Sequence, residues 1–253
     1  MQKFASTKTI LLVGGYGTRL RKAIPQVPKA MAEVGGVPFL EYLVYQLSQQ
    51  GFRDMIFCIG YLGEKIKDYF RDGRRWSVNI KYSIEKELLG TAGAVKLAAK
   101  GFGDENFLVI NGDTFMTLEF NTLIKYHLKK MAIATIALAK VNNVMRFGKV
   151  ITSRDNLILQ FSEKGNHGPG YINGGIYVFN RKILEFIPEG KKVSLEKDIF
   201  PKLISNKFYG RKFPRAYFVD IGTPESYLNI RNNPEVILSK LKVQKTLKGV
   251  NFE

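Results

Sequence analysis

The residues with the clearest chemical potential lie near the amino terminus, where an apolar run breaks into glycines followed by two cations. The run reads Leu-Leu-Val-Gly-Gly-Tyr-Gly-Thr-Arg-Leu over residues 11–20, and Pro28-Lys29 follows it. Glycine lacks a Cβ, so successive N–H groups can point into one concavity that suits a phosphate. Arg19 adds a planar fork of donors and Lys29 a compact charge. We expect this loop to hold a polyphosphate; for the glycines alone, an ordinary turn is the alternative.

Two familiar glycine loops are excluded by their spacing. A dinucleotide fingerprint would need a third glycine where Leu20 stands, and a Walker loop would need Gly-Lys followed by Ser or Thr, which the chain lacks. The loop therefore belongs to another class of phosphate-binding sequence.

Two carboxylates follow apolar runs farther along the chain. Asp113 comes after Leu108–Asn111 and a glycine, and Asp220 comes after Phe218-Val219. Asn-Gly-Asp on its own is more often an ordinary turn. A second carboxylate at a strand end changes those odds, because carboxylates in such places suit a hard cation such as Mg²⁺.

Strands and helices alternate through the first half of the 253 residues. Repeated β-α-β units predict an α/β domain with a mostly parallel sheet, covered on both faces, with ligands at the carboxyl ends of the strands. The apolar patterns predict strands at 55–59, 79–84 and 107–110 and helices at 38–50, 64–70 and 91–99.

The pattern changes at about residue 132. Strands are expected at 133–139, 148–152, 158–161 and 171–179, and helices at 181–187, 195–204 and 224–241. We expect one domain over 1–253, with a nucleotide-binding part at about 1–131, a β-rich acceptor-binding part at about 132–223 and a carboxyl-terminal helix with a basic tail at 224–253.

Composition limits the partners. The chain has 39 basic and 22 acidic residues, but the lysines are scattered and no nucleic-acid-binding signature accompanies them, so we expect no specific nucleic acid. No long apolar run or signal core is present, which predicts a soluble, cytoplasmic protein without membrane contact. Cys58 reads as a core residue, His167 as a loop residue and His127 as a surface residue of a helix. The oligomeric state, monomer or homo-oligomer, is left open.

The whole segment from about Thr9 to Tyr227 resembles the sugar-1-phosphate nucleotidylyltransferases, whose opening motif is a strand, then Gly-Gly-x-Gly-Thr-Arg-Leu, then a Pro-Lys pair. The resemblance implies a Rossmann-like three-layer sheet of the nucleotidyltransferase type with a smaller β-rich lobe. It implies that Arg19, Lys29 and Asp113 are catalytic and that Asp113 and Asp220 share one Mg²⁺. The implied nucleotide-binding residues are Val13, Gly14, Gly15, Gly17, Thr18, Arg19, Glu85, Gly90, Thr91, Asn111, Gly112 and Asp113.

Base choice is expected at Glu85, which precedes Gly90 by five residues as in the base-recognition segment of that family. An ionised carboxylate has only acceptors, and the Watson–Crick edge of guanine offers two adjacent donors. Thymine and uracil would place a carbonyl against the carboxylate, so Glu85 favours GTP. The alternative is a solvated glutamate at a strand end. Leu88 stands where the family commonly has proline.

The implied sugar-phosphate-binding residues are Lys29, Arg146, Gly148, Glu163, Lys164, Asn173 and Gly174. Further segments, including Ile172–Gly175 and Ser194–Asp198, are similar to the guanylyltransferases that convert GTP and D-glycero-D-manno-heptose 1-phosphate into GDP-heptose for surface polysaccharide. The alternatives are a mannose-1-phosphate guanylyltransferase, a glucose-1-phosphate cytidylyl- or thymidylyltransferase, and a non-catalytic nucleotide- or RNA-binding module.

Overall fold

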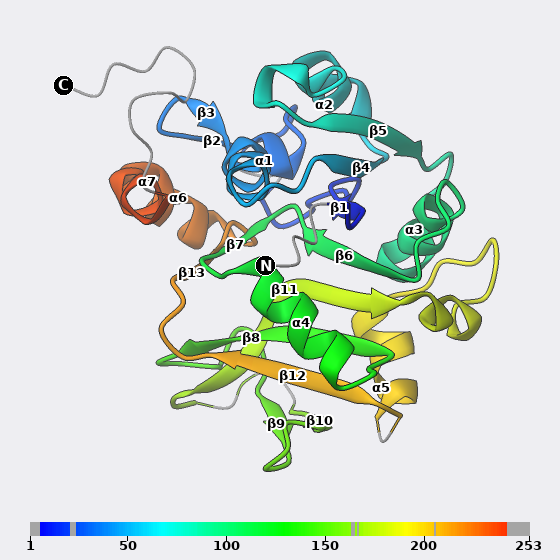
Figure 1. Cartoon of the computed structure of the whole chain (residues 1–253). Helices are drawn as coiled ribbons and strands as arrows, with labels where there is room; N and C mark the ends of the chain where they lie inside the picture. The colour runs from blue at the N-terminus through cyan, green and yellow to red at the C-terminus, as the bar shows by residue number, and fades with distance from the viewer. Residues whose placement is uncertain (1–5, 21–23, 163–164, 166, 205, 242–253) are drawn as a thin grey trace.

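A seven-stranded sheet organises the chain (Figure 1). The computed structural model describes residues 6–20, 24–162, 165, 167–204 and 206–241. The strand order is β12-β8-β11-β6-β1-β4-β5. The bounds of the strands are β1 Thr9–Leu12, β4 Asp54–Ile59, β5 Asn79–Ile84, β6 Asn106–Asn111, β8 Ala134–Val141, β11 Gly170–Asn180 and β12 Phe208–Phe213.

The central strands are buried on both faces, as a parallel sheet requires. Ile10 packs into one apolar cluster and Leu11 into the other, and Val109 and Ile110 divide in the same way. Side chains that alternate along a strand point to opposite faces, so these two clusters lie on the two sides of the sheet. The predicted mostly parallel, three-layer α/β fold is confirmed.

Helices cover both faces. On the side of Leu11 lie α1 (Phe39–Gln49), α2 (Gly63–Phe70), α4 (Phe120–Lys129), α6 (Pro224–Asn232) and α7 (Glu235–Leu241). On the side of Ile10 lie α3 (Gly90–Ala99), the 3₁₀ helix η3 (Arg181–Phe186), the π-helix η4 (Leu195–Ile199) and α5 (Phe200–Leu203). Short 3₁₀ turns, η1 (Lys29–Met31) and η2 (Arg74–Trp76), complete the set.

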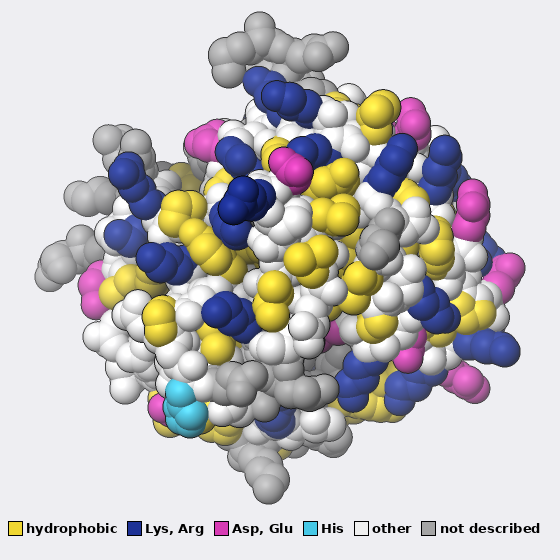
Figure 2. Space-filling model, turned by 90° about the horizontal axis from the view of Figure 1, so that it is seen from below, with side chains coloured by type: hydrophobic (Ala, Val, Ile, Leu, Met, Phe, Trp, Pro, Cys, Tyr) yellow, Lys and Arg dark blue, Asp and Glu magenta, His cyan; other side chains and the backbone are white. Residues whose placement is uncertain are grey.

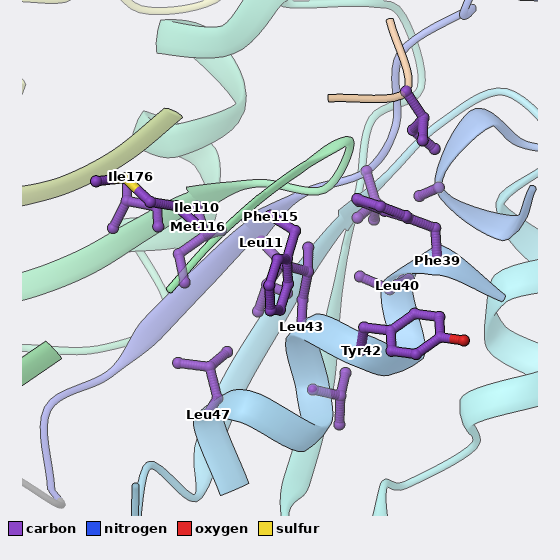
Figure 3. Close-up of a cluster of buried hydrophobic side chains, with 14 of the residues drawn as sticks. Leu11, Phe39, Leu40, Tyr42, Leu43, Leu47, Ile110, Phe115, Met116 and Ile176 are labelled. Carbon is purple, nitrogen blue, oxygen red and sulfur yellow. The ribbon is translucent and has the colours of Figure 1, made fainter. Parts of the chain in front are cut away.

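Helix α1 shows how one layer is held. Its apolar residues Leu40, Leu43 and Leu47 follow a helical period and are almost completely buried. Figure 3 shows Leu43 beside Leu11 of β1 and Phe115, and all three leucines of α1 belong to the same buried cluster as Ile110. Burial of one leucine side chain contributes about 1.5–3 kcal/mol. The helix therefore fixes the strands whose ends form the site.

Strand β11 is antiparallel to its neighbours β6 and β8, and its register with β8 shifts between Asn173 and Tyr177. Asn173 pairs with Leu138 of β8, but Tyr177 pairs with Ile136, so four steps along β11 match two along β8. The two extra residues are absorbed at a glycine step, where Gly175 has a φ of +72°. Three two-stranded sheets lie outside the central one: β2 (Glu33–Val34) with β3 (Val37–Pro38), β7 (Thr114–Met116) with β13 (Phe218–Asp220), and β9 (Val150–Thr152) with β10 (Ile158–Phe161).

Several helical elements differ from the sequence-based expectation. The single helix expected over 224–241 is two helices, because Pro234 cannot donate a backbone N–H and pushes Asn233 out of helical geometry, to φ −131° and ψ 56°. The helix expected over 195–204 begins as one π-turn, and that over 181–187 is a 3₁₀ helix. The basic tail from residue 242 lies outside the described residues.

His127 was expected at the surface, and that prediction is wrong. It lies on the buried stripe of α4 with Phe120, Leu123 and Ile124, and only 1% of it is exposed. Its Nε2 lies 3.1 Å from Oδ1 of Asn106, an acceptor, and its Nδ1 lies 3.0 Å from the Thr135 hydroxyl. Nε2 therefore carries the proton. Burial lowers the pKa of His127 from 6.5 to about 4.

Figure 2 shows Lys and Arg side chains spread among apolar side chains over one face of the molecule, with fewer Asp and Glu. The positive charge on this face is dispersed rather than gathered into one block. Within the described part of the chain, no helix combines the length and the apolar character that a bilayer span needs.

Candidate active site

The carboxyl ends of β1, β4, β5 and β6 meet at one edge of the sheet, and the predicted polar segments follow them there. The glycine loop follows β1, Glu85 follows β5 and Asp113 follows β6. Because β11 runs in the opposite direction and pairs Ile176 with Ile110, its first residues extend past the end of β6. Asn173 therefore lies at the same edge.

These segments line one cavity of about 630 Å³. Among the residues predicted to form the site, the lining contains Val13, Gly14, Gly15, Gly17, Arg19, Lys29, Glu85, Gly90, Thr91, Asn111, Gly112, Asp113, Arg146, Gly148, Asn173 and Asp220. The lining does not include Thr18 or Gly174. Glu163 and Lys164 lie outside the described residues.

Gly14 and Gly112 are required by close packing between loops. A Cβ on Gly14 would lie 2.8 Å from the backbone N of Gly60, in the loop after β4. A Cβ on Gly112 would strike Val13 and approach the carbonyl oxygen of Leu12 at 3.0 Å. The N–H of Gly112 donates to that same carbonyl at 2.9 Å. The absence of side chains at these two positions thus keeps the loops of β1, β4 and β6 in contact.

Lys29 reaches the acidic side of the cavity from η1. Its Nζ donates to Oδ2 of Asp113, and the Lys29 side chain is only 16% exposed. Gly17, with φ +56°, lies against the stem of Lys29, since a Cβ there would be 3.0 Å from the Cβ of Lys29. The glycine loop therefore leaves room for the lysine beneath it, and both face the same cavity.

Asp220 lies beside Asp113 because β13, which ends in Asp220, pairs with β7, which begins one residue after Asp113. Asp220 of β13 is opposite Thr114 of β7, and the N–H of Ile221 donates to the carbonyl of Asp113 at 3.0 Å. The N–H of Gly222 donates to Oδ2 of Asp220 at 2.9 Å. Two segments separated by about a hundred residues of sequence thus bring two carboxylates together at one edge of the cavity.

A second cation, Arg146, reaches Asp220 from the segment before β9. Its Nη2 lies 3.1 Å from both Oδ1 and Oδ2 of Asp220. Its guanidinium also lies over the ring of Phe147, with Cζ 5.0 Å from the centroid. Each of the two carboxylates is therefore paired with a cation of the chain itself.

Glu85, which follows β5, lines the cavity next to the glycine loop. One carboxylate oxygen, Oε2, accepts the N–H of Leu89 at 2.9 Å, and the other, Oε1, lies against Gly14. Burial raises the pKa of the Glu85 carboxyl, and the Leu89 N–H opposes that effect. The carboxylate is thus held in place with acceptor capacity left for a ligand.

A hydrogen-bonded group lines the opposite side of the cavity. The Asn173 amide nitrogen donates to the Tyr177 hydroxyl at 3.0 Å and lies 3.1 Å from Oε1 of Glu196. Asn111 lies 3.4 Å from the same hydroxyl. Tyr177 itself is 1% exposed, and burial raises the pKa of its hydroxyl. Asn173 and Glu196 therefore present oriented polar groups to the cavity.

A family model described as nucleotidyl transferase matches residues 8–235, which is most of the chain. The chain belongs to the nucleotidyl transferase family. It is an enzyme of that family, and the resemblance seen in the sequence is confirmed.

Two curated relatives share a name. The D-glycero-alpha-D-manno-heptose 1-phosphate guanylyltransferase of Aneurinibacillus thermoaerophilus is 41% identical over 222 residues, covering 87% of this chain and 95% of the relative. The enzyme of the same name from Campylobacter jejuni is 38% identical over 231 residues, which cover 89% of this chain and 99% of the relative. The solved structure of HddC from Yersinia pseudotuberculosis complexed with GMP-PN is 34% identical with a TM-score of 0.81, covering 90% of this chain and 99% of that one.

Sequence reasoning missed several residues that line the cavity of this nucleotidyl transferase. Tyr177, Lys192, Glu196 and Gly222 all contribute to the lining. Glu196 lies in the Ser194–Asp198 segment, which served only as a mark of resemblance. Glu196 lies in a π-turn, and such turns are frequent at functional sites. The helical pattern of the sequence did not distinguish this turn from an ordinary α-helix.

Proposed function

We propose that this enzyme transfers GMP from GTP to D-glycero-α-D-manno-heptose 1-phosphate, giving GDP-heptose and pyrophosphate. The observation that carries the reaction type is the convergence of the glycine loop, Arg19, Lys29 and two aspartates on one cavity. The choice of base and sugar rests on the relatives named as heptose 1-phosphate guanylyltransferases, which match nearly from end to end. The pathway role that follows is the synthesis of surface polysaccharide.

The acceptor is already an anion, so the reaction needs no covalent enzyme intermediate. A phosphate oxygen of the sugar 1-phosphate attacks the α-phosphorus of GTP in line. The new P–O bond forms as the bond to the bridging oxygen breaks, and pyrophosphate leaves. Catalysis is then mainly positioning and charge neutralisation.

Lys29 is placed to align the acceptor phosphate with the α-phosphate, because its ammonium group lies between the glycine loop and the aspartates. Arg19, exposed at the end of the loop, steadies the leaving pyrophosphate. Glu85 selects guanine through its acceptor oxygens. Asn173 and Glu196 contact the sugar hydroxyls from the opposite side of the cavity.

Asp113 and Asp220 fit a magnesium ion. They offer carboxylate oxygens from the turn before β7 and from the end of its partner β13, and Mg²⁺ commonly takes one or two protein carboxylates and completes its shell with phosphates and water. Among the described residues no cluster of three or more His, Cys, Asp or Glu could hold a metal, so these two would do so with the substrate. When bound, the ion would reduce the repulsion between the two anionic substrates.

The test is pyrophosphate release from each of GTP, ATP, CTP and UTP or dTTP with a panel of sugar 1-phosphates. We expect turnover with GTP and the heptose 1-phosphate to exceed all other pairs. The panel includes mannose 1-phosphate and glucose 1-phosphate, the open alternatives. A higher kcat/KM with mannose 1-phosphate or glucose 1-phosphate would show that this sugar phosphate, and not the heptose 1-phosphate, is the acceptor. If no pair releases pyrophosphate, the proposed transferase activity is refuted.

A further inference from the structure

Both aspartates of the site are engaged by cations that belong to the chain. Lys29 pairs with Asp113, and Arg146 pairs with both oxygens of Asp220. The Asp220 side chain is 16% exposed, so the guanidinium replaces much of its solvent. With both of its oxygens held by Arg146, the Asp220 carboxylate is not free to bind a divalent ion, whereas Lys29 pairs with only one oxygen of Asp113.

The position of Arg146 is fixed by apolar packing as well as by charge. Its guanidinium lies over Phe147, and the ring of Phe147 meets that of Phe218 edge to face, with centroids 5.4 Å apart. Phe218 begins β13, the same short strand that ends in Asp220. One nitrogen of Arg146 also lies 3.5 Å from the Ser226 hydroxyl. The arginine is thus aimed at Asp220 without any substrate.

Arg146 and a divalent cation compete for the same oxygens. Oδ2 of Asp220 already accepts the N–H of Gly222, and Nη2 of Arg146 lies within 3.1 Å of both oxygens. A dication on those oxygens would sit beside a fixed positive charge in a half-buried cavity, where repulsion is weakly screened. Arg146 must move before Asp220 can act as a ligand.

Arg146 comes from the acceptor side of the cavity. It precedes Gly148 and β9, whereas Lys29 and the glycine loop come from the nucleotide side. A phosphate monoester offers a guanidinium more charge and more acceptor oxygens than the carboxylate does. The phosphate able to draw Arg146 from Asp220 is therefore that of the acceptor.

We propose that Arg146 blocks Asp220 from the divalent cation in the ligand-free enzyme and that the acceptor phosphate releases it. The acceptor and the metal then bind with positive coupling, and by linkage each strengthens the other equally. This inference rests on the proposed function only in naming the phosphate as the acceptor's. Arg146 would act as a positioning residue for Asp220 in addition to any contact with substrate.

The experiment is a Mn²⁺ titration of the enzyme without GTP, followed by the electron paramagnetic resonance signal of free Mn²⁺. It compares wild type, Arg146→Gln and Arg146→Lys. Arg154→Gln, in the exposed turn between β9 and β10, is the control that removes the same charge elsewhere. Each protein is titrated alone and with inorganic phosphate, heptose 1-phosphate or GMP, and each additive is titrated without protein for its own Mn²⁺ binding.

For Arg146→Gln we expect Mn²⁺ to bind about tenfold more tightly than to wild type, with no further gain from phosphate. Wild type and Arg154→Gln should bind weakly alone and gain about tenfold with inorganic phosphate or heptose 1-phosphate. Arg146→Lys keeps the positive charge, so without additives its Mn²⁺ affinity should stay within about threefold of that of the wild type.

Unchanged or weaker Mn²⁺ binding by a folded Arg146→Gln protein overturns the inference. So does a phosphate effect that survives in that variant, or an equal effect from GMP, which would move the displacing phosphate to the nucleotide. Because the titration needs neither GTP nor turnover, it separates the two proposals. If inorganic phosphate strengthens Mn²⁺ binding and heptose 1-phosphate does not, the release mechanism holds and the proposed acceptor is wrong.

Discussion

The Gly222→Ala substitution tests whether the exact placement of the Asp220 carboxylate limits turnover. A Cβ on Gly222 would come closer to Oδ2 of Asp220 than the 3.0 Å that real Cβ atoms keep. The backbone of Gly222 is outside the left-handed region, so alanine meets no strain of that kind there. The conflict therefore falls on the end of one side chain and not on the fold.

The size of the effect follows from the displacement. To regain an ordinary contact of 3.4 Å, the carboxylate of Asp220 must move by on the order of 1 Å. That movement breaks the hydrogen bond from the Gly222 N–H and takes the oxygens out of the position they hold beside Arg146. A misplacement of this size commonly lowers a rate about a hundredfold, equivalent to about 2.7 kcal/mol of transition-state stabilisation.

The assay is steady-state pyrophosphate release with GTP and heptose 1-phosphate, together with urea unfolding of the same preparations. We expect kcat/KM to fall about a hundredfold while the free energy of unfolding changes by less than about 1 kcal/mol. Gly103→Ala is the matched control, since a Cβ at Gly103 meets no atom within 4 Å. Near-normal turnover in Gly222→Ala, or a loss of turnover that parallels a loss of stability, would refute the reasoning.

Three other substitutions probe separate parts of the structure. Lys29→Ala removes the partner of Asp113 and should lower kcat/KM at least about a hundredfold with the fold retained by circular dichroism; near-normal pyrophosphate release would remove its catalytic role. In Glu85→Gln, the amide oxygen would keep the Leu89 N–H and the amino group would face the donors of guanine. Its kcat/KM for GTP should fall about 10- to 100-fold relative to UTP, and an unchanged GTP/UTP ratio would contradict guanine recognition by Glu85. Burial lowers the pKa of His127 from 6.5 to about 4. Between these two pH values the histidine is protonated in the unfolded chain and neutral in the folded chain, so the folded state loses stability as the pH falls through this range. Over this pH range the free energy of unfolding of the wild type should fall by about 3 kcal/mol, and that of His127→Gln should not fall by this amount. If urea unfolding depends equally on pH in both proteins, His127 is not the cause of the pH dependence.

The nucleotide half of the fold could be predicted because its signals are local. Strands β4 and β6 are short apolar runs, and the glycine loop and Asp113 follow the ends of β1 and β6. A parallel sheet brings such ends to one edge, so the sequence alone indicated that these groups would meet. Asp220 reaches them in another way, through the antiparallel pairing of β13 with β7 outside that sheet. The guanidinium of Arg146 could be assigned to the acceptor side but not to Asp220, because that contact joins positions 74 residues apart.

Other misses had readable signals. Phe120, Leu123, Ile124 and His127 follow the i, i+3, i+4, i+7 pattern, so His127 occupies a position of the buried stripe of α4. Pro234 likewise marks the break between α6 and α7. Strand β12 is harder, because its Gly-Arg-Lys centre reads as a loop and becomes a strand only through pairing with β8 at the sheet edge.

The glycine step in β11 lets the two ends of that strand change independently. From Ile176 onward the strand pairs with β6, which is the neighbour of β1 and of the glycine loop that follows it, whereas Gly170–Asn173, before the step, pair with β8 alone. Before Gly174 it contributes Asn173 to the other wall of the cavity. Residues gained or lost ahead of the step would reshape the chamber that receives the sugar without altering the register behind Asp113. A single scaffold could in this way exchange acceptors over evolution and keep its chemistry unchanged.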